Sequence, residues 1–380
     1  MIFGSAFISG LVLTYAVIWV TRKYGWVYVP TVNRWSKRVV SLHGGIAIAL
    51  SFLIAHLFIG DLSYTSTEFW LIGLSLVMLS VGFLDDLYGL MPLPKLIVQF
   101  LVSAAAFYSG LCFNFFDYGI LNFLISIFWI VGVTNAVNLL DNMDGASPGV
   151  SLISLLSIAY ICFSTDPSLA IISLGLAGSL LGFLCFNFHP SKIFMGDTGS
   201  LFLGTLISLA LMKLSQGLAL QGGEFLNLPQ SLLIPALLVV VPILDTSFVT
   251  INRKLNGYPV SKGDRGHIAH RLVYLFNSEK GAVSCLYLLQ VTALFIITTQ
   301  SFVLLYPMLV ITILSLILLT FATNQYVWPE KKYENFSTTL SRVGLLDTEF
   351  LWKPWTWLTS SLNRIREFKP RRQERDSSLS

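Results

Sequence analysis

Residues 187–200 read N-F-H-P-S-K-I-F-M-G-D-T-G-S, and apolar segments at about 169–186 and 200–215 enclose them. The carboxylate of Asp197 stands between two glycines at the start of the second apolar segment, and His189 and Lys192 precede it. Glycines let a backbone come close to a phosphate, and a carboxylate in such a turn can hold the Mg²⁺ that phosphates carry. The stretch therefore predicts two membrane helices with a chemical site at their shared boundary.

The composition is typical of a polytopic membrane protein. Of the 380 residues 54 % are hydrophobic and 12 % are charged, whereas soluble domains carry about a quarter of charged residues. The first apolar run, residues 2–20, is followed rather than preceded by basic residues, so we expect a retained first span and not a cleaved signal peptide. The four cysteines have no C-x-x-C spacing, which predicts small buried thiols rather than disulfides or metal ligands.

Hydropathy predicts an all-α, multi-pass protein with about eleven membrane helices and no internal repeat. The expected ranges are about 2–21, 43–60, 69–84, 95–111, 118–135, 150–163, 169–186, 200–215, 231–251, 282–300 and 303–322. Lys and Arg concentrate in the first loop, in the connection at 252–281 and in the tail, and such residues mark the cytoplasmic side. We therefore expect the N-terminus outside, the C-terminus in the cytoplasm and the polar loops facing the cytoplasm.

The tail, residues 324–380, is a separate cytoplasmic element in this prediction. Residues 350–368 mix tryptophans with basic residues, which suits an amphipathic helix resting on the inner leaflet. An ordinary polar tail with a few exposed aromatic side chains is the alternative.

Two adjacent carboxylates, Asp85 and Asp86, close the third apolar segment in V-G-F-L-D-D-L-Y-G-L. Such a pair is costly at the end of a membrane helix unless it is solvated, paired or bound to a cation. A solvated helix end is the simpler alternative. Lys95 begins the next segment, where it is either a snorkelling anchor or the charge that receives an anionic lipid headgroup.

The stretch T-N-A-V-N-L-L-D-N-M-D-G, residues 134–145, places Asn135, Asn138, Asp141 and Asp144 at intervals of three. Residues three apart share a helix face, so Asn138 and Asp141 can point together into a cleft. Helix capping explains one such residue but not four. Beside these two acidic loops Asp197 becomes the best metal-ligand candidate, because Mg²⁺ takes one or two protein oxygens and completes its shell with phosphates. A glycine turn capped by a hydroxyl side chain is the alternative for Asp197.

The connection R-K-L-N-G-Y-P-V-S-K-G-D-R-G-H-I-A-H-R-L, residues 253–272, carries His267 and His270 between Arg265 and Arg271. The two histidines and Asp264 could suggest zinc, but the arginines repel a cation and prefer phosphate. A basic loop that only marks the cytoplasmic side is the alternative.

These four loops, in this order, resemble the polyprenyl-phosphate N-acetylhexosamine-1-phosphate transferases of glycosyltransferase family 4. The matching elements are D-D at 85–86, N-x-x-N-x-x-D-x-x-D-G at 135–145, F-M-G-D-T-G-S at 194–200 and D-R-x-H-x-x-H-R-L from 264. The last element is more similar to the bacterial branch that uses UDP-GlcNAc than to the branch with a triple-histidine run. Asn142 and Ala269 depart from the usual Gly and His, so UDP-FucNAc and UDP-QuiNAc remain alternative donors.

The resemblance implies transfer of GlcNAc-1-phosphate from a UDP-sugar to undecaprenyl phosphate, with release of UMP. The enzyme would be Mg²⁺-dependent (Mn²⁺ is the alternative ion) and would start a cell-envelope polysaccharide such as the O-antigen of lipopolysaccharide. It would lie in the inner (plasma) membrane, contact membrane lipid but no nucleic acid, and act as a monomer or a homodimer. Residues 1–323 would form the catalytic membrane domain, with active-site loops at about 85–95, 135–149, 187–199 and 252–281.

The resemblance also implies roles for the candidate residues. Asp197 and Asn138 would hold Mg²⁺, and Lys95 would position the acceptor phosphate. Asp141 and Asp144 would shape the nucleotide end, Asn135 would bind substrate, and the sugar-phosphate would be gripped by Arg265, His267, His270 and Arg271. Asp85 or Asp86 is the candidate base, but the second pKa of a phosphate monoester is about 6, so an orienting role is an equal alternative.

Two other classes of function remain open. A transporter is also polytopic, but its site usually lies near the membrane midplane, and here the predicted spans are nearly free of charge except for Lys213. A catalytically silent scaffold that binds lipid or nucleotide is the second rival, against which Asp197 and Asn138 argue.

Overall fold

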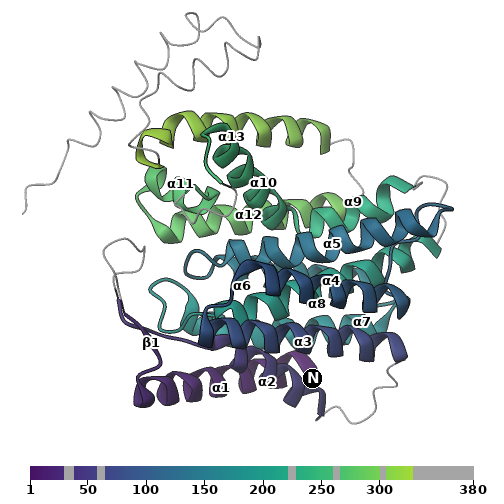
Figure 1. Cartoon of the computed structure of the whole chain (residues 1–380), viewed down its shortest axis with the longest axis horizontal. Coiled ribbons are helices and arrows are strands. Elements are labelled where there is room, and N and C mark those ends of the chain that lie inside the picture. Colours follow the sequence, from purple (N-terminus) through teal and green to yellow (C-terminus); the bar gives the residue numbers. More distant parts are fainter. Residues whose placement is uncertain (30–37, 58–64, 221–227, 260–265, 300–304, 328–380) are drawn as a thin grey trace, which may run out of the picture.

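The computed structural model describes residues 1–29, 38–57, 65–220, 228–259, 266–299 and 305–327. Over these residues it contains thirteen helices and one small two-stranded sheet (Figure 1). The N-terminal half comprises α1 (Ile2–Tyr24), β1 (Val27–Tyr28), β2 (Val40–Ser41), α2 (Gly44–Leu57), α3 (Ser66–Tyr88), α4 (Pro92–Tyr108), α5 (Gly119–Leu140) and α6 (Ala146–Cys162). The remainder comprises α7 (Pro167–Asn187), α8 (Gly196–Leu220), α9 (Leu228–Leu238), α10 (Val240–Leu255), α11 (Ile268–Phe276), α12 (Glu279–Thr298) and α13 (Leu305–Val327).

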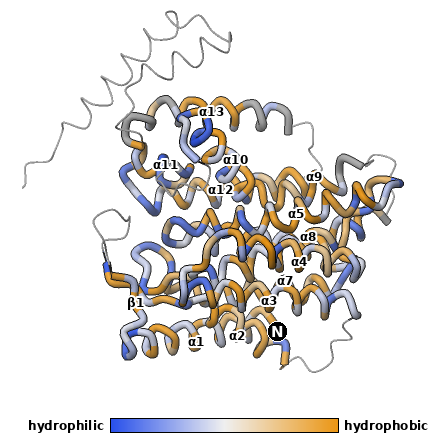
Figure 2. Tube along the Cα trace, viewed as in Figure 1, coloured by the Kyte–Doolittle hydropathy of each residue, from blue (hydrophilic) through white to orange (hydrophobic). Residues whose placement is uncertain are grey.

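The helical membrane architecture is confirmed. Six helices, α1, α3, α5, α7, α8 and α12, are long and apolar enough to cross a membrane, and the bent pair of α9 and α10 would make seven. Shorter apolar helices occupy the other predicted segments. Figure 2 shows hydrophobic residues along the helices and hydrophilic residues mainly at their ends and around α10 and α11. The count of eleven spans and the orientation of the termini stay predictions, and the predicted tail helix at 350–368 lies outside the described residues.

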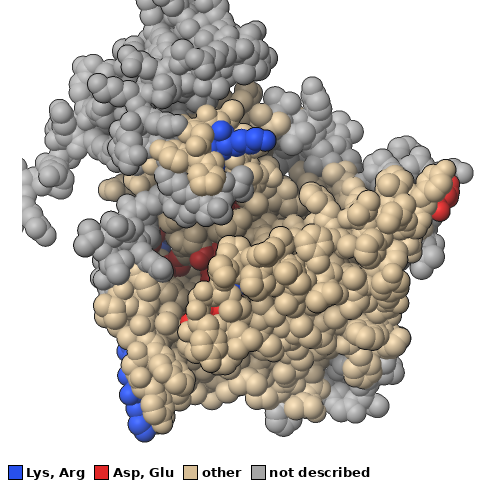
Figure 3. Space-filling view, viewed as in Figure 1, with Lys and Arg blue, Asp and Glu red and all other residues tan. Residues whose placement is uncertain are grey.

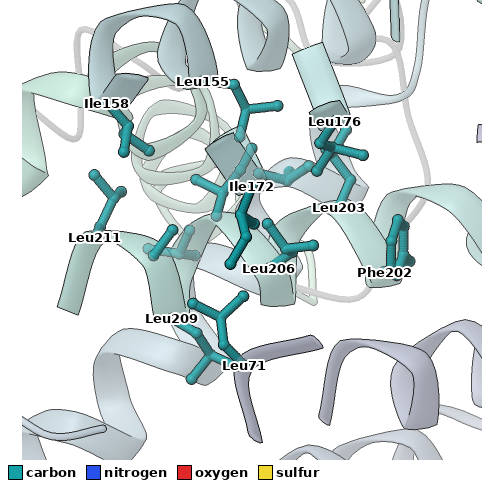
Figure 4. Packing of buried hydrophobic residues seen from close by; sticks show 14 of the residues in the cluster. Leu71, Leu155, Ile158, Ile172, Leu176, Phe202, Leu203, Leu206, Leu209 and Leu211 are labelled. Carbon is teal, nitrogen blue, oxygen red and sulfur yellow. The ribbon is translucent and has the colours of Figure 1, made fainter. Parts of the chain in front are cut away.

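Helix α8 lies at the centre of the molecule, and all side chains from 198 to 212 are buried. It packs against α3 on one side and α5 on another. Figure 4 shows this core at close range, with leucine, isoleucine and phenylalanine side chains of α3, α6, α7 and α8 meeting around α8. The glycine-rich stretch that carries Asp197 therefore leads directly into a buried central helix, which holds it in place.

Glycines allow a close contact between α1 and α7. A Cβ added at Gly178 would lie 2.3 Å from the carbonyl oxygen of Phe3, and one at Gly182 would lie 2.7 Å from the backbone of Leu11. Small residues four apart let backbones approach in this way, which is a common packing mode of membrane helices. The first apolar segment is therefore packed into the bundle against α7.

The predicted continuous helix at 231–251 is wrong. The chain bends by 78° between α9 and α10. Pro242 has no N–H to donate to the carbonyl of Leu238, four residues earlier, so the helical hydrogen bond is missing there. The buried side chain of Gln290 on α12 donates to the carbonyls of Leu237 (3.2 Å) and Leu238 (2.8 Å) instead. A distant glutamine thus stabilises a break that hydropathy alone does not show.

The early loop is joined to the stretch at 187–200 by backbone hydrogen bonds. Ser41 donates its N–H to the carbonyl of Lys192 (3.1 Å) and accepts the N–H of Phe194 (2.9 Å). Gly44 and Gly45 then donate to the carbonyls of Phe194 and Met195 (both 2.9 Å). This ladder fixes the position of the glycine-rich turn before α8 begins.

The four cysteines are free, as expected. Cys112 and Cys162 are buried and Cys285 is half-buried, but Cys185 is exposed, so the predicted burial is wrong for that residue. It lies on the outward face of α7, where its thiol donates to the carbonyl of Leu181 (3.3 Å).

Candidate active site

Carboxylates gather in a hollow on one face of the molecule. Figure 3 shows Asp and Glu atoms inside a recess between the layer that contains α10–α13 and the helices below it, whereas most of the surrounding helical surface carries no charge. The predicted acidic motifs lie at helix ends: the first in the last turn of α3, the second at the end of α5 and just after it, and the third in the first turn of α8. The packing of these three helices brings the motifs to the same end.

Asp86 caps the N-terminus of α8. One carboxylate oxygen accepts the N–H of Asp197 (2.9 Å), and the other accepts the N–H (3.0 Å) and the hydroxyl (2.5 Å) of Thr198. A Cβ added at Gly196 would lie 2.5 Å from this carboxylate, so the glycine is required for close packing. A carboxylate of the protein thus already occupies these two backbone N–H groups.

Lys95 joins two of the predicted acidic loops. Its ammonium nitrogen lies 2.9 Å from Oδ2 of Asp85 and 3.0 Å from Oδ2 of Asp197. The lysine and Asp197 remain partly open to solvent, with side-chain exposures of 22 % and 28 %. The predicted functional lysine is thus at the centre of the acidic group and within reach of a ligand.

The two predicted asparagines have different surroundings. Asn138 donates to Oδ1 of Asp197 (3.1 Å) and to the hydroxyl of Ser200 (2.7 Å), so it belongs to the group around Asp197. Asn135 instead exchanges amide hydrogen bonds with Gln99 on α4 (2.7 and 3.3 Å). The structure brings Asn138, but not Asn135, to the acidic centre.

Asp141 follows the last residue of α5 and is half-buried. Within the described part of the chain its carboxylate has no hydrogen-bond donor. Burial raises the pKa of Asp141 to about 8, and nearby carboxylates, foremost that of Asp197, add to the rise. An unpartnered carboxylate among other carboxylates is a strong acceptor for a cation or a proton.

Asp144 lies in a second polar group beside the first. It accepts hydrogen bonds from the N–H (2.9 Å) and hydroxyl (2.8 Å) of Ser191 and lies 3.2 Å from Nδ1 of His189. The same imidazole nitrogen lies 2.8 Å from Glu279 at the start of α12. Asp144, His189 and Glu279 could together hold a metal ion, since their ligand atoms lie within 4.8 Å of one another.

The fourth predicted loop is only partly described, and Arg265 lies outside the described residues. His267 and His270 are both buried near the start of α11, with ring centroids 6.2 Å apart. Arg271 is fully buried; it donates to the carbonyl of Gly266 and to the hydroxyl of Thr323, and its guanidinium lies 5.2 Å from the ring of Phe248. These contacts hold α11 against α13 and α10, and the predicted substrate-gripping role of Arg271 stays a prediction.

Sequence reasoning missed several polar residues of this region. Asp245 on α10 accepts from His267, and the statement that the predicted spans carry no charge apart from Lys213 is wrong at this position. A lone carboxylate in V-V-P-I-L-D-T could have signalled a partner. Glu279 gave no such signal, because its nearness to His189 depends on how α12 packs.

The oxygen-rich donor set around Asp197 suits a hard divalent cation. Asp197 and Asp141 offer carboxylate oxygens, and Asn138 could offer its amide oxygen after a rotation that exchanges its nitrogen and oxygen. The surplus of negative charge that raises the pKa of Asp141 would favour such an ion. The ion's expected ligands, Asp197 and Asn138, are therefore chemically suited to it.

Comparison with known proteins identifies the family. The model of glycosyl transferase family 4 matches residues 68–215. A probable undecaprenyl-phosphate N-acetylglucosaminyl 1-phosphate transferase of Bacillus subtilis is 36 % identical over 291 residues, which cover 73 % of this chain and 78 % of the relative.

Two further relatives have different printed activities. A decaprenyl-phosphate N-acetylglucosaminephosphotransferase of Mycolicibacterium smegmatis is 31 % identical over 56 % of this chain and 58 % of its own length. A phospho-N-acetylmuramoyl-pentapeptide-transferase of Halalkalibacterium halodurans is 35 % identical over 56 % of this chain and 70 % of its own length. The chain therefore belongs to glycosyl transferase family 4, the family of polyprenyl-phosphate N-acetylhexosamine-1-phosphate transferases whose motifs its sequence resembles.

Proposed function

We propose that this protein transfers GlcNAc-1-phosphate from UDP-GlcNAc to undecaprenyl phosphate and releases UMP, as the first step of a cell-envelope polysaccharide. The observation that carries the proposal is Lys95, held between Asp85 and Asp197 beside the unpartnered carboxylate of Asp141. The Lys95 ammonium can thus bind an anionic group such as a phosphate, and the carboxylates around it suit a divalent ion. The B. subtilis and M. smegmatis relatives carry N-acetylglucosamine in their printed names, which supports this sugar over UDP-FucNAc and UDP-QuiNAc.

In this reaction an oxygen of the lipid phosphate forms a bond to the β-phosphorus of the donor. The bond from that phosphorus to the bridging oxygen breaks, and UMP leaves with the oxygen. One pyrophosphate replaces another, so catalysis consists mainly of positioning and charge neutralisation. Mg²⁺ on Asp197 and Asn138 would supply the neutralisation of the donor pyrophosphate.

Lys95 would receive the acceptor phosphate, which is largely dianionic at neutral pH because its second pKa is about 6. No general base is then required. Asp86 is already engaged by three donors from the start of α8, and Asp85 is paired with Lys95. Both carboxylates therefore have an orienting role in this proposal.

The side that faces the cytoplasm follows from loop charge. The basic residues of α1 and α10, Arg22, Lys23, Arg253 and Lys254, lie in the last turns of their helices. Positive residues at helix ends mark the cytoplasmic side of a bacterial inner membrane. We place the acidic hollow on that side, where UDP-sugars are available.

The test uses membranes that contain the chain, Mg²⁺, undecaprenyl phosphate and radiolabelled UDP-GlcNAc, and measures label transferred into the organic phase. Asp197→Asn should reduce transfer at least about 10³-fold, because it removes the charge at the centre of the site. Asp117→Asn, the same change at an exposed position before α5, is the matched control and should retain wild-type activity.

Transfer that requires lipid and Mg²⁺ and reverses with added UMP would support the proposal. Transfer only from another UDP-N-acetylhexosamine would change the sugar. No transfer from any donor in the panel would contradict the enzyme and favour a silent lipid- or nucleotide-binding scaffold.

A further inference from the structure

Asp245 is a fully buried carboxylate on α10, in a segment that is otherwise mostly apolar. A carboxylate in such surroundings is costly unless its oxygens are well partnered. Both oxygens have a partner on the polypeptide that begins α11. Oδ2 lies 2.7 Å from Nδ1 of His267, and Oδ1 accepts the N–H of Ile268 at 2.7 Å.

The two contacts act on different parts of the same segment. His267 is the residue that precedes the first turn of α11, and the bond to Ile268 satisfies one of the free N–H groups at that helix start. The bond to Nδ1 has a separate effect, since an ionised carboxylate there requires a hydrogen on Nδ1. Asp245 thus fixes the backbone, the ring orientation and the nitrogen that carries the hydrogen. Only Nε2 of the ring is left for a ligand.

The residues that follow His267 share a buried cluster with the turn after α5. Ile268 and Ala269 belong to the same apolar cluster as Leu140 and Met143. These last two residues lie on either side of Asp141, whose pKa is raised by burial and further by its acidic neighbours. The start of α11 and the second acidic motif therefore contribute to one packed region.

A purely structural cap would not need the ion pair. An amide oxygen can accept the N–H of Ile268 as well as a carboxylate oxygen can, because asparagine caps helices as effectively as aspartate. What an amide nitrogen cannot do is accept a hydrogen from Nδ1. The carboxylate is required only if the state of the ring matters.

We propose that Asp245 is a positioning residue for His267: its carboxylate accepts the hydrogen of Nδ1 and orients an imidazolium ring whose Nε2–H can donate to a phosphate oxygen of the substrate. With Asp245 ionised, a protonated ring forms one half of a buried charge pair. This inference rests on the proposed function, because it concerns the phosphate groups of the donor and acceptor. His270 and Arg271, on the same helix, do not contact Asp245 among the described interactions.

The test is a double-mutant cycle of Asp245→Asn and His267→Gln in the full-length chain. Asp245→Asn retains the shape and the acceptor for Ile268, and we expect it to lower kcat about 10- to 100-fold with a smaller change in KM. The double variant should be no slower than His267→Gln alone. Additive losses, or a lower melting temperature with unchanged kcat, would overturn the proposal.

Ser278→Ala is the matched control for the loss of a cap. Ser278 accepts the N–H of Gly281 at the start of the neighbouring helix α12, without any histidine partner. It should lower the melting temperature and leave kcat of the folded protein unchanged. The comparison separates the capping role of Asp245 from its effect on His267.

NMR of the histidine rings in wild-type protein tests the proposal even if the variants do not fold or the protein does not catalyse the proposed reaction. The chain has five histidines, so ¹⁵N-histidine labelling of wild-type protein gives few signals, and comparison with His267→Gln identifies the relevant one. Hydrogens on both ring nitrogens are expected in the presence of UDP, and a ring that lacks the hydrogen on either nitrogen would overturn the proposal. If wild-type protein transfers no sugar, the proposed function fails. The double-mutant cycle is then measured as the increase in melting temperature that UDP causes in each variant. Non-additive losses of this increase support the positioning role, and additive losses reject it.

Discussion

The two ends of the antiparallel pair of α3 and α8 carry similar charged groups but serve different purposes. At one end Lys95 contacts Asp85 and Asp197. At the other end Lys213 contacts Glu68 and Asp166. Each lysine therefore joins two carboxylates from different parts of the chain.

The difference lies in exposure and in what surrounds the pairs. Lys213 and Glu68 are 15 % and 2 % exposed, and the hydroxyl of Thr65 also contacts Glu68. At the Lys95 end the lysine and Asp197 are 22 % and 28 % exposed, and the carboxylate of Asp141 has no donor in the described structure. At the Lys213 end only Asp166 is as exposed, at 29 %. A lysine between carboxylates thus indicates a site only where an unpaired carboxylate and access for a ligand remain, as at the Lys95 end (the open end). The same residue types join helices together where the carboxylate is buried and paired, as at the Lys213 end (the closed end).

Among these variants, Lys213→Met should cause the largest loss of stability, because it removes the cation of the closed end. It leaves Glu68 buried without its cation, and removal of one partner of a buried ion pair costs about 3–5 kcal/mol. The free energy of unfolding in detergent should fall by this amount, whereas transfer per folded molecule should change little. Lys213→Met with Glu68→Gln should recover most of the stability. A loss of activity without a loss of stability would contradict the distinction between the two ends.

Among these variants, Lys95→Met should cause the largest loss of transfer activity, because it removes the cation of the open end. It removes the cation proposed to receive the acceptor phosphate, and we expect the transfer rate to fall roughly 10²- to 10³-fold, about 3–4 kcal/mol in activation free energy. The rate is measured at saturating Mg²⁺ and compared with Lys23→Met, an exposed lysine on α1. Unchanged transfer would show that Lys95 is only a structural anchor.

Gly82→Ala tests whether α3 and α8 must touch near the open end. A Cβ at Gly82, one turn before Asp86, would lie 2.1 Å from the carbonyl oxygen of Asp197. We expect a loss of stability of about 1–3 kcal/mol, together with reduced transfer, because the helices must separate. Gly73→Ala on the same helix meets no atom within 4 Å and is the control. Equal stability of the two variants in thermal unfolding would refute the close contact.

Asp141→Asn tests the unpaired carboxylate of the open end through the pH dependence of stability. The pKa of Asp141 in the folded chain is about 8, above the ordinary value of 3.8, so the folded state binds the proton more tightly than the unfolded state. This group therefore destabilises the fold increasingly as pH rises from about 4 to about 8. The variant should gain stability relative to wild type over that window, as measured by unfolding midpoints with a chelator present. A constant difference between pH 5 and pH 8 would contradict the raised pKa.

Much of the architecture follows from the sequence because apolar runs of this length admit few alternatives. Helices occupy all the predicted apolar segments, and the spacing of Asn138, Asp141 and Asp197 indicated residues that share one region. The break at Val239 was not predictable in this way, since it depends on Pro242 together with Gln290 from a later helix. The role of Asp86 was equally hidden, because hydropathy does not reveal which helix start a carboxylate will meet.

The fourth loop shows where motif spacing fails. Arg271 and His270 are one apart in sequence, and both looked suited to phosphate. The structure uses Arg271 to join α11 to α13 through Thr323, a contact that spans 52 residues. Its neighbour His267 depends on Asp245, 22 residues earlier. Such assignments require the packing of helices, which local sequence does not contain.

The cap that Asp86 places on α8 has a consequence for inhibitors. A helix start with free N–H groups attracts phosphate and sulfate, so it is often the first place at which a phosphate mimic gains affinity. Here the protein supplies its own anion to that position, like a counterion that never dissociates. Compounds that present a bare phosphate surrogate should gain little from α8. Cationic groups that compete with Lys95 for Asp85 and Asp197, or chelating groups that would bind the proposed Mg²⁺, should bind more tightly.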